Sequence, residues 1–183
     1  MGRTFTPISV STLGSTKRPE IARETHPFAF EVKAAIEEAI AGTSAAAYHL
    51  LWELLDPGTD SEDVLIRLQP RKITACPVAA HAMEDAYFLA LSVGRNSAFE
   101  LPLKGQFPVR DSLRPLEVLD AVVRAAVEGR VQETVWVAQG IIIQSEATID
   151  IPGEPLRSRR GGAYAPLRIE DAAKQKIDYE PYE

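Results

Sequence analysis

Hydrophobic and polar positions alternate along one stretch of the chain, residues 134–151. Its odd positions are mostly apolar or small, and its even positions from 144 to 150 are polar. A period of two residues is typical of a β-strand with one face in a protein core and the other in water. Trp136 and Ala138 make the even face of the first third apolar as well, which indicates cover on both faces there. The pattern therefore predicts one long strand, or two strands joined at Gly140.

Helical spacing of apolar residues marks three other segments. Residues 28–41 repeat apolar side chains every three or four positions, and Pro27 fits the first turn of a helix. Residues 45–55 carry a second apolar stripe at this spacing, which predicts a second helix. A third amphipathic segment has Pro115 in its first turn and ends before Gly129, a residue suited to the position after a helix.

Shorter alternating runs lie between the second and third predicted helices. We expect strands at 63–69, 73–76, 86–93 and 98–103, separated by turns rich in Gly, Pro, Asn and Ser. We expect residues 77–85 to form a connector. Short connections between successive strands favour antiparallel pairing.

The element order α-α-β-β-β-β-α-β predicts an α+β fold, with a mostly antiparallel sheet of about five strands and helices packed on one face. Residues 1–27 hold three prolines and no sustained period, so we expect an extended or disordered arm. Residues 28–151 are expected to form a single α+β domain. Residues 152–183 are expected to form a linker-like tail with a short helix at 169–177 and a loose end.

Composition narrows the class of protein. A chain of 183 residues with 45% hydrophobic content can bury a core without help from metals or disulfides. The single cysteine, Cys76, cannot form an internal disulfide, and we find no apolar leader and no apolar run of about 18 residues. We therefore expect a cytoplasmic protein that does not span a membrane. Abundant Ala and Arg beside one Asn, Asn96, are typical of a high-GC bacterial coding sequence.

Negative charge is concentrated in the predicted domain. The formal net charge of the chain is −6, and residues 28–151 hold ten Lys and Arg against 18 Asp and Glu. Nucleic-acid binding depends on Lys and Arg contacts to phosphates, so this balance argues against a nucleic-acid partner. It suits a basic protein partner, although an acidic surface also serves solubility alone.

The sequence offers one candidate for chemistry, the run from His81 to Asp85. In a helical turn His81, Glu84 and Asp85 would share one face and could hold a divalent metal or form an acid–base pair, with Cys76 as a further ligand. The alternative is a polar connection between two strands. No nucleophile elbow, phosphate-binding loop, dinucleotide fingerprint or paired-histidine zinc motif occurs. The sequence thus favours a protein that is not an enzyme, and we expect no cofactor.

Aromatic and basic residues outside the predicted core are candidates for partner contacts. Two aromatic residues fall on the less apolar faces of predicted strands, and three arginines form the most basic run of the chain. The last six residues interleave aromatic rings with acids. The candidate partner-binding residues are Phe88, Trp136, Arg157, Arg159, Arg160, Tyr179 and Tyr182. Core packing, a solvated linker and a disordered end are the respective alternatives.

These observations favour a non-catalytic bacterial protein-interaction module. It would bind a basic protein partner through an acidic surface, in the manner of an inhibitor or immunity protein. One alternative is a small enzyme or a metal- or ligand-binding protein that uses His81, Glu84 and Asp85. Another is a structural subunit that self-associates through the open edge of its sheet.

Overall fold

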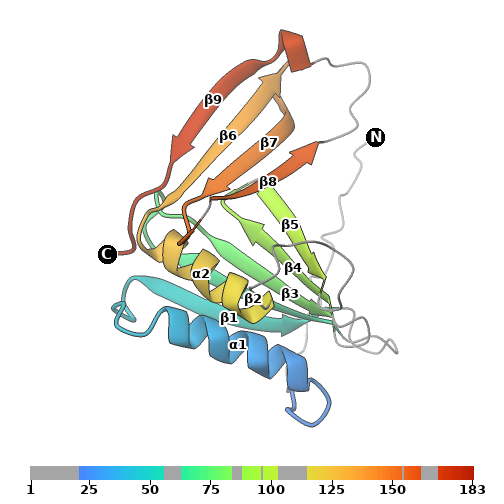
Figure 1. Ribbon diagram of the computed structural model, residues 1–183, viewed down its shortest axis with the longest axis vertical. Helices are drawn as coiled ribbons and strands as arrows, with labels where there is room; N and C mark the ends of the chain where they lie inside the picture. Colours follow the sequence, from blue (N-terminus) through green and yellow to red (C-terminus); the bar gives the residue numbers. More distant parts are fainter. Residues whose placement is uncertain are drawn as a thin grey trace, which may run out of the picture.

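The computed structural model describes residues 21–55, 63–83, 88–95, 97–102, 115–153, 155–161 and 169–183. These residues form two helices, nine strands and one short 3₁₀ turn (Figure 1). The helical elements are α1 (Pro27–Ala39), α2 (Pro115–Val127) and η1 (Ile169–Asp171). The strands are β1 (Tyr48–Leu54), β2 (Val64–Pro70), β3 (Val78–Met83), β4 (Phe88–Val93), β5 (Ser97–Pro102), β6 (Val131–Ala138), β7 (Ile141–Ile149), β8 (Leu156–Gly161) and β9 (Ala173–Asp178).

The strands form two antiparallel sheets rather than one. Strands β1 to β5 form a meander in which each strand pairs with the next along the chain. The second sheet has four strands in the order β8-β7-β6-β9. The α+β class is therefore confirmed, whereas the prediction of one sheet of about five strands accounts only for the first sheet.

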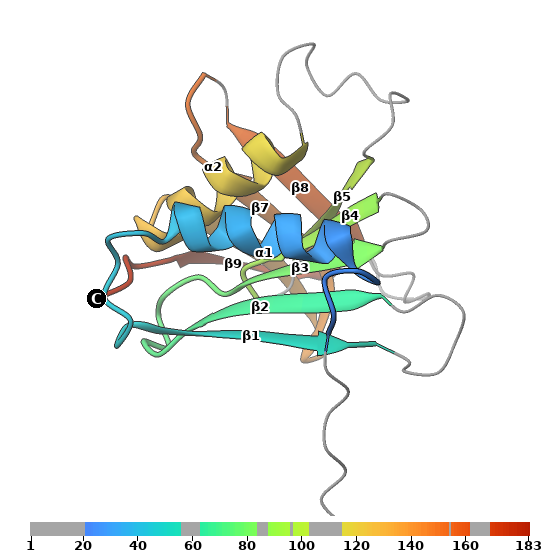
Figure 2. The same cartoon turned by 90° about the horizontal axis from the view of Figure 1, so that it is seen from below.

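Both helices lie side by side over one face of the first sheet (Figures 1 and 2). α1 packs over β3, and α2 packs over β4 and reaches β7 of the second sheet. Strand β3 presents Ala80 and Ala82 to the core, and these small side chains let α1 approach the sheet closely. No helix within the described residues is long and apolar enough to cross a membrane.

Residues 48–54 form strand β1, so the second predicted helix, at 45–55, is wrong. The sequence YHLLWEL satisfies both periods, because apolar residues recur at helical spacing and also at alternate positions. Tyr48, Leu50, Trp52 and Leu54 pack against the core, and the intervening side chains lie on the opposite face of the sheet. Pairing with β2 along all of β1 decides in favour of the strand.

The alternating stretch at 134–151 is a hairpin, which was the second of the two alternatives. β6 and β7 are joined by Gln139 and Gly140, whose φ angles are 51° and 77°. A two-residue turn with both φ angles positive matches the twist of the flanking strands. The turn lies where the alternation of apolar and polar residues is interrupted. Gly140 therefore marks, in the sequence, the point where the chain reverses its direction.

Two predictions near the middle of the chain are wrong. The short strand expected at 73–76 is only an isolated bridge between Ala75 and Glu180. The connector expected at 77–85 contains strand β3. Its sequence VAAHAM is rich in alanine, which has little strand preference, and its position between β2 and β4 holds it extended.

The tail after residue 151 adds two strands to the second sheet. β8 pairs with β7, and β9 pairs with β6. The helix predicted at 169–177 is wrong, since only η1 is helical there and residues 173–178 form β9. Strand β9 lies at a sheet edge and most of its side chains are exposed, so it lacks the apolar alternation that marks a half-buried strand.

Candidate protein-binding groove

A groove of about 550 Å³ runs between α1 and α2 on the outer surface of the helix layer. The two helices run in the same direction, so each contributes one stripe of side chains along the groove (Figure 1). The lining residues are Glu31, Ala34, Ala35 and Glu38 from α1, and Leu116, Glu117, Asp120 and Arg124 from α2.

Helical periodicity places these side chains on one face of each helix. On α1, the lining positions recur at intervals of three or four residues, beside the stripe formed by Val32 and Ile36, which is buried against the sheet. On α2 the same spacing sets Leu116, Asp120 and Arg124 beside its own buried stripe. The groove is thus a direct result of two amphipathic helices with acidic flanks.

The lining of the groove combines acidic and apolar side chains. Four of its residues carry carboxylates, and Ala34, Ala35 and Leu116 supply the apolar part. Lys33, the single cation of α1, points elsewhere: its Nζ forms an ion pair with Glu37 and lies 5.3 Å from the centre of the Trp52 ring. Lys33 therefore forms its ion pair outside the set of carboxylates that line the groove.

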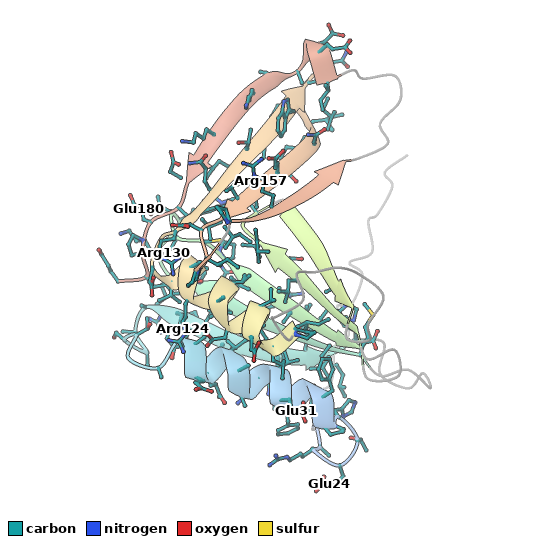
Figure 3. All side chains as sticks on the ribbon, viewed as in Figure 1. Glu24, Glu31, Arg124, Arg130, Arg157 and Glu180 are labelled. Atoms are coloured by element: carbon teal, nitrogen blue, oxygen red, sulfur yellow. The ribbon has the colours of Figure 1, made fainter. Side chains whose placement is uncertain are left out.

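Among the described residues that line the groove, Arg124 is the one cation, and Asp120 neutralises it. Its Nε donates hydrogen bonds to both carboxylate oxygens of Asp120, at 2.9 and 3.1 Å. These bonds raise the pKa of the guanidinium above its ordinary value. Nη2 also donates to the main-chain oxygen of Glu38 at 3.5 Å, which links the C-terminal ends of the two helices (Figure 3). Glu31 and Glu38 of α1 line the groove beyond this pair.

His81 lies in strand β3 and not in a helical turn, so the argument that placed it beside Glu84 and Asp85 fails. Its Nε2 lies 3.1 Å from Oδ2 of Asp63. Glu84 and Asp85 lie outside the described residues. Within the part of the chain that the structure describes, no group of three or more His, Cys, Asp or Glu side chains is arranged to hold a metal ion.

Cys76, the further ligand considered for such a site, is buried in the segment between β2 and β3. Burial raises the pKa of its thiol to about 12. A thiol that stays protonated is neither a strong nucleophile nor a ready metal ligand. Cys76 is a core residue.

The residues predicted to contact a partner do not form one surface. Phe88 begins β4 in the first sheet, whereas Trp136 lies in β6 of the second sheet, with Nζ of Lys174 5.5 Å from its ring centre. Arg157, Arg159 and Arg160 lie in strand β8, which pairs with β7, rather than in a linker. Arg157 is exposed (Figure 3).

Tyr179 and Tyr182 are buried, with only 4% and 7% of their surfaces exposed. The hydroxyl of Tyr179 donates to Oε2 of Glu133 at 2.6 Å, and that of Tyr182 donates to the main-chain oxygen of Cys76 at 2.5 Å. Both rings belong to the core of their own chain, so the partner-binding role predicted for them does not fit the structure.

The spacing of acidic residues on α1 was a sign of the groove in the sequence. The net charge alone did not show where on the chain the groove would lie. On α1, Glu31 and Glu38 are seven residues apart, which places them two turns apart on one face. The parallel placement of α2 beside α1 could not be deduced from this spacing, because the two helices are separated by five strands. Comparisons with protein-family models, with curated proteins and with solved structures found no match.

Proposed function

We propose that the protein is a non-catalytic interaction module that binds a basic segment of another protein in the groove between α1 and α2. The observation that carries this proposal is a groove whose lining combines four carboxylates with the apolar side chains of Ala34, Ala35 and Leu116. An amphipathic helix with small apolar residues on one side and Lys or Arg on its flanks complements such a groove. The module would act as an inhibitor of the immunity type, covering a basic surface of its target.

Charge in the rest of the molecule supports the same kind of partner. The excess of acids in residues 28–151 attracts a basic protein at long range, and it raises the rate of encounter at low salt. Affinity would come from contact in the groove itself, where apolar burial and paired charges act together. Binding should therefore weaken as salt rises, without being abolished.

Removal of two carboxylates from α1 tests the proposal. We expect Glu31→Gln combined with Glu38→Gln to weaken binding of a Lys- and Arg-rich amphipathic helical peptide by about tenfold, because two ion pairs at a partly exposed site are lost. Titration calorimetry gives the affinity, and amide chemical shifts should change at Ala34, Ala35 and Leu116 when the peptide is added.

The matched control is Glu170→Gln with Asp171→Asn, which removes the same charge from the exposed turn η1 that precedes β9. This variant should bind the peptide as the wild type does. A target captured from a cell lysate should be retained by the wild type and by the control, and lost by the α1 variant. Equal affinities for the two variants, or shift changes confined to other surfaces, would overturn the groove as the binding site.

A further inference from the structure

Strand β1 is the outermost strand of the first sheet, and no strand among the described residues pairs with its second edge. Figure 2 shows it at the margin of the sheet, on the side away from the second sheet. An open edge presents a row of main-chain N–H and C=O groups that can pair with another strand.

The hydrogen bonds at the two ends of β1 show which residues face the open edge. The N–H of Leu55 donates to the oxygen of Asp63 at 2.7 Å, and the N–H of Arg71 donates to the oxygen of Ala47 at 2.9 Å. Odd-numbered residues therefore direct their main-chain groups toward β2. The even-numbered residues Tyr48, Leu50, Trp52 and Leu54 direct theirs toward the open edge.

The edge of β1 lacks the bulge, the proline and the lysine that commonly prevent strand pairing. The strand is seven residues long, pairs with β2 without a bulge, and contains no proline, lysine or arginine. Its outward-facing Leu51 is 53% exposed. The ring of Trp52 is held in place by an edge-on contact with Phe30, at 4.9 Å between ring centres. The edge strand is thus regular, and its only acidic or basic side chains are those of His49 and Glu53.

We propose that two copies of the chain pair through β1, antiparallel, about a two-fold axis that passes between the two Leu51 residues. The two five-stranded sheets then form one continuous sheet. Leu50 of each copy lies opposite Trp52 of the other, and both residues direct their main-chain groups to the new pair. The pairing rests on the sheet edge alone and does not depend on the groove, which lies between the helices.

This register is self-complementary on both faces of the sheet. On the outer face, Leu51 meets its own copy, and His49 lies opposite Glu53 of the second copy on both sides of the axis. The carboxylate of Glu53 already forms an ion pair with Arg67 of its own chain at 3.0 Å. In the dimer it would therefore lie between two basic side chains. A shift of two residues in either direction shortens the paired segment and places His49 opposite a leucine.

The molar mass in solution tests the pairing. We expect light scattering to give twice the chain mass for the wild type at about 100 µM. Leu51→Lys places two like charges across the axis and should give the chain mass at the same concentration. Ile73→Lys is the control, since Ile73 is 81% exposed and lies outside β1. It should remain dimeric.

Disulfide formation tests the register independently of the lysine variant. Residues that face each other at a non-hydrogen-bonded position have Cβ atoms about 4.5–5.5 Å apart, so Leu51→Cys should form a disulfide-linked dimer under mild oxidation. His49→Cys should not, because the two copies of residue 49 are separated along the strands. Cys76 is buried and does not interfere. A monomeric wild type, a dimeric Leu51→Lys variant or efficient cross-linking through residue 49 would each overturn the proposal.

Discussion

At the scale of single residues, the most unusual feature is a fully buried carboxylate, Glu133. Its exposed fraction is 0%, and Oε2 accepts hydrogen bonds from the hydroxyl of Tyr179 at 2.6 Å and from the N–H of Arg95 at 3.1 Å. The N–H of Arg95 also donates to the Tyr179 oxygen at 3.0 Å. Burying a carboxylate costs free energy unless hydrogen-bond donors replace its contacts with water. The contacts with Tyr179 and Arg95 therefore reduce the cost of burying Glu133.

Tyr179→Phe removes one donor from the buried carboxylate of Glu133. We expect it to lower the free energy of unfolding by about 1–3 kcal/mol, because a charged acceptor loses a hydrogen bond inside the protein. Tyr182→Phe removes a donor from a neutral main-chain oxygen and should cost about 0.5–1.5 kcal/mol. Urea unfolding measures both. A larger loss for Tyr182→Phe would contradict this account of Glu133.

The sequence held one trace of this site. Glu133 occupies a buried position of β6 together with Val131 and Val135, where an acid interrupts an apolar series. Its partner Tyr179 is 46 residues away in the sequence. The spacing of residues predicts neighbours within one helix or strand, but it carries no information about such a distant pair, so the tyrosines were assigned to an external partner.

At the scale of elements, two glycines that end or connect elements differ in what surrounds them. Gly129 follows α2 with φ of 73°, and a Cβ there would lie 2.7 Å from the nitrogen of Pro181. Gly140 turns the β6–β7 hairpin with φ of 77°, and a Cβ there would meet nothing within 4 Å. Both positions favour glycine for its backbone freedom, but only Gly129 is also needed for space.

Substitution by alanine separates these two requirements. Gly140→Ala should cost about 1 kcal/mol of stability from backbone strain alone. Gly129→Ala should cost about 2–3 kcal/mol, because the added methyl group also displaces the main chain at Pro181. Thermal unfolding of the two variants measures the difference. Equal losses would show that Pro181 moves aside freely.

Elements were predictable where a single period was present. α1 and α2 were expected at nearly their observed bounds, because each has one clear apolar stripe and a proline at its start. β1 was not, since YHLLWEL fits two periods and its pairing with β2 decides between them. β3 and β9 were missed for the opposite reason, because an alanine-rich strand and a mostly exposed, mostly polar edge strand show no clear apolar period.

At the scale of the whole molecule, the last residues join parts that are far apart in the sequence. The N–H of Tyr182 donates to the oxygen of Val127, the last residue of α2, and the N–H of Glu180 donates to the oxygen of Thr74 before β3. Lys72 forms ion pairs with Glu180 and Glu183 at 2.9 and 3.3 Å. The α+β class followed from the element order, but these long-range contacts and the division into two sheets did not.

Three buried groups where the last residues pack against the core, Cys76, Tyr179 and Tyr182, predict how the free energy of unfolding depends on pH. Burial raises the pKa of the Cys76 thiol from 9.0 to about 12, and it raises the pKa of the Tyr179 and Tyr182 hydroxyls above 10.0. Above about pH 9 the unfolded chain therefore releases protons that the folded chain keeps. The stabilisation is complete below that pH and is lost as pH rises toward the folded-state pKa values.

Urea midpoints measured between about pH 8 and about pH 11 should fall steadily as pH rises. Cys76→Ala should reduce the slope at the lower end of this range, where the thiol of the unfolded chain titrates first. Arg-to-Lys changes on the surface should leave the slope unaltered. A midpoint that stays constant over this range would contradict the assignment of these three groups as buried and protonated.

The bridge between Ala75 and Glu180 also leads us to expect an order in which the parts of the molecule fold. Contacts within the β1–β5 meander join neighbouring segments, whereas Thr74 and Glu180 are 106 residues apart. Closing so long a loop costs conformational entropy. Contacts at its two ends offset this cost only once the surfaces that they pack against have formed. The meander and its helices should therefore form early, and the last strand and the residues after it should complete the structure in the slowest step. The same segment should detach first when the native state opens.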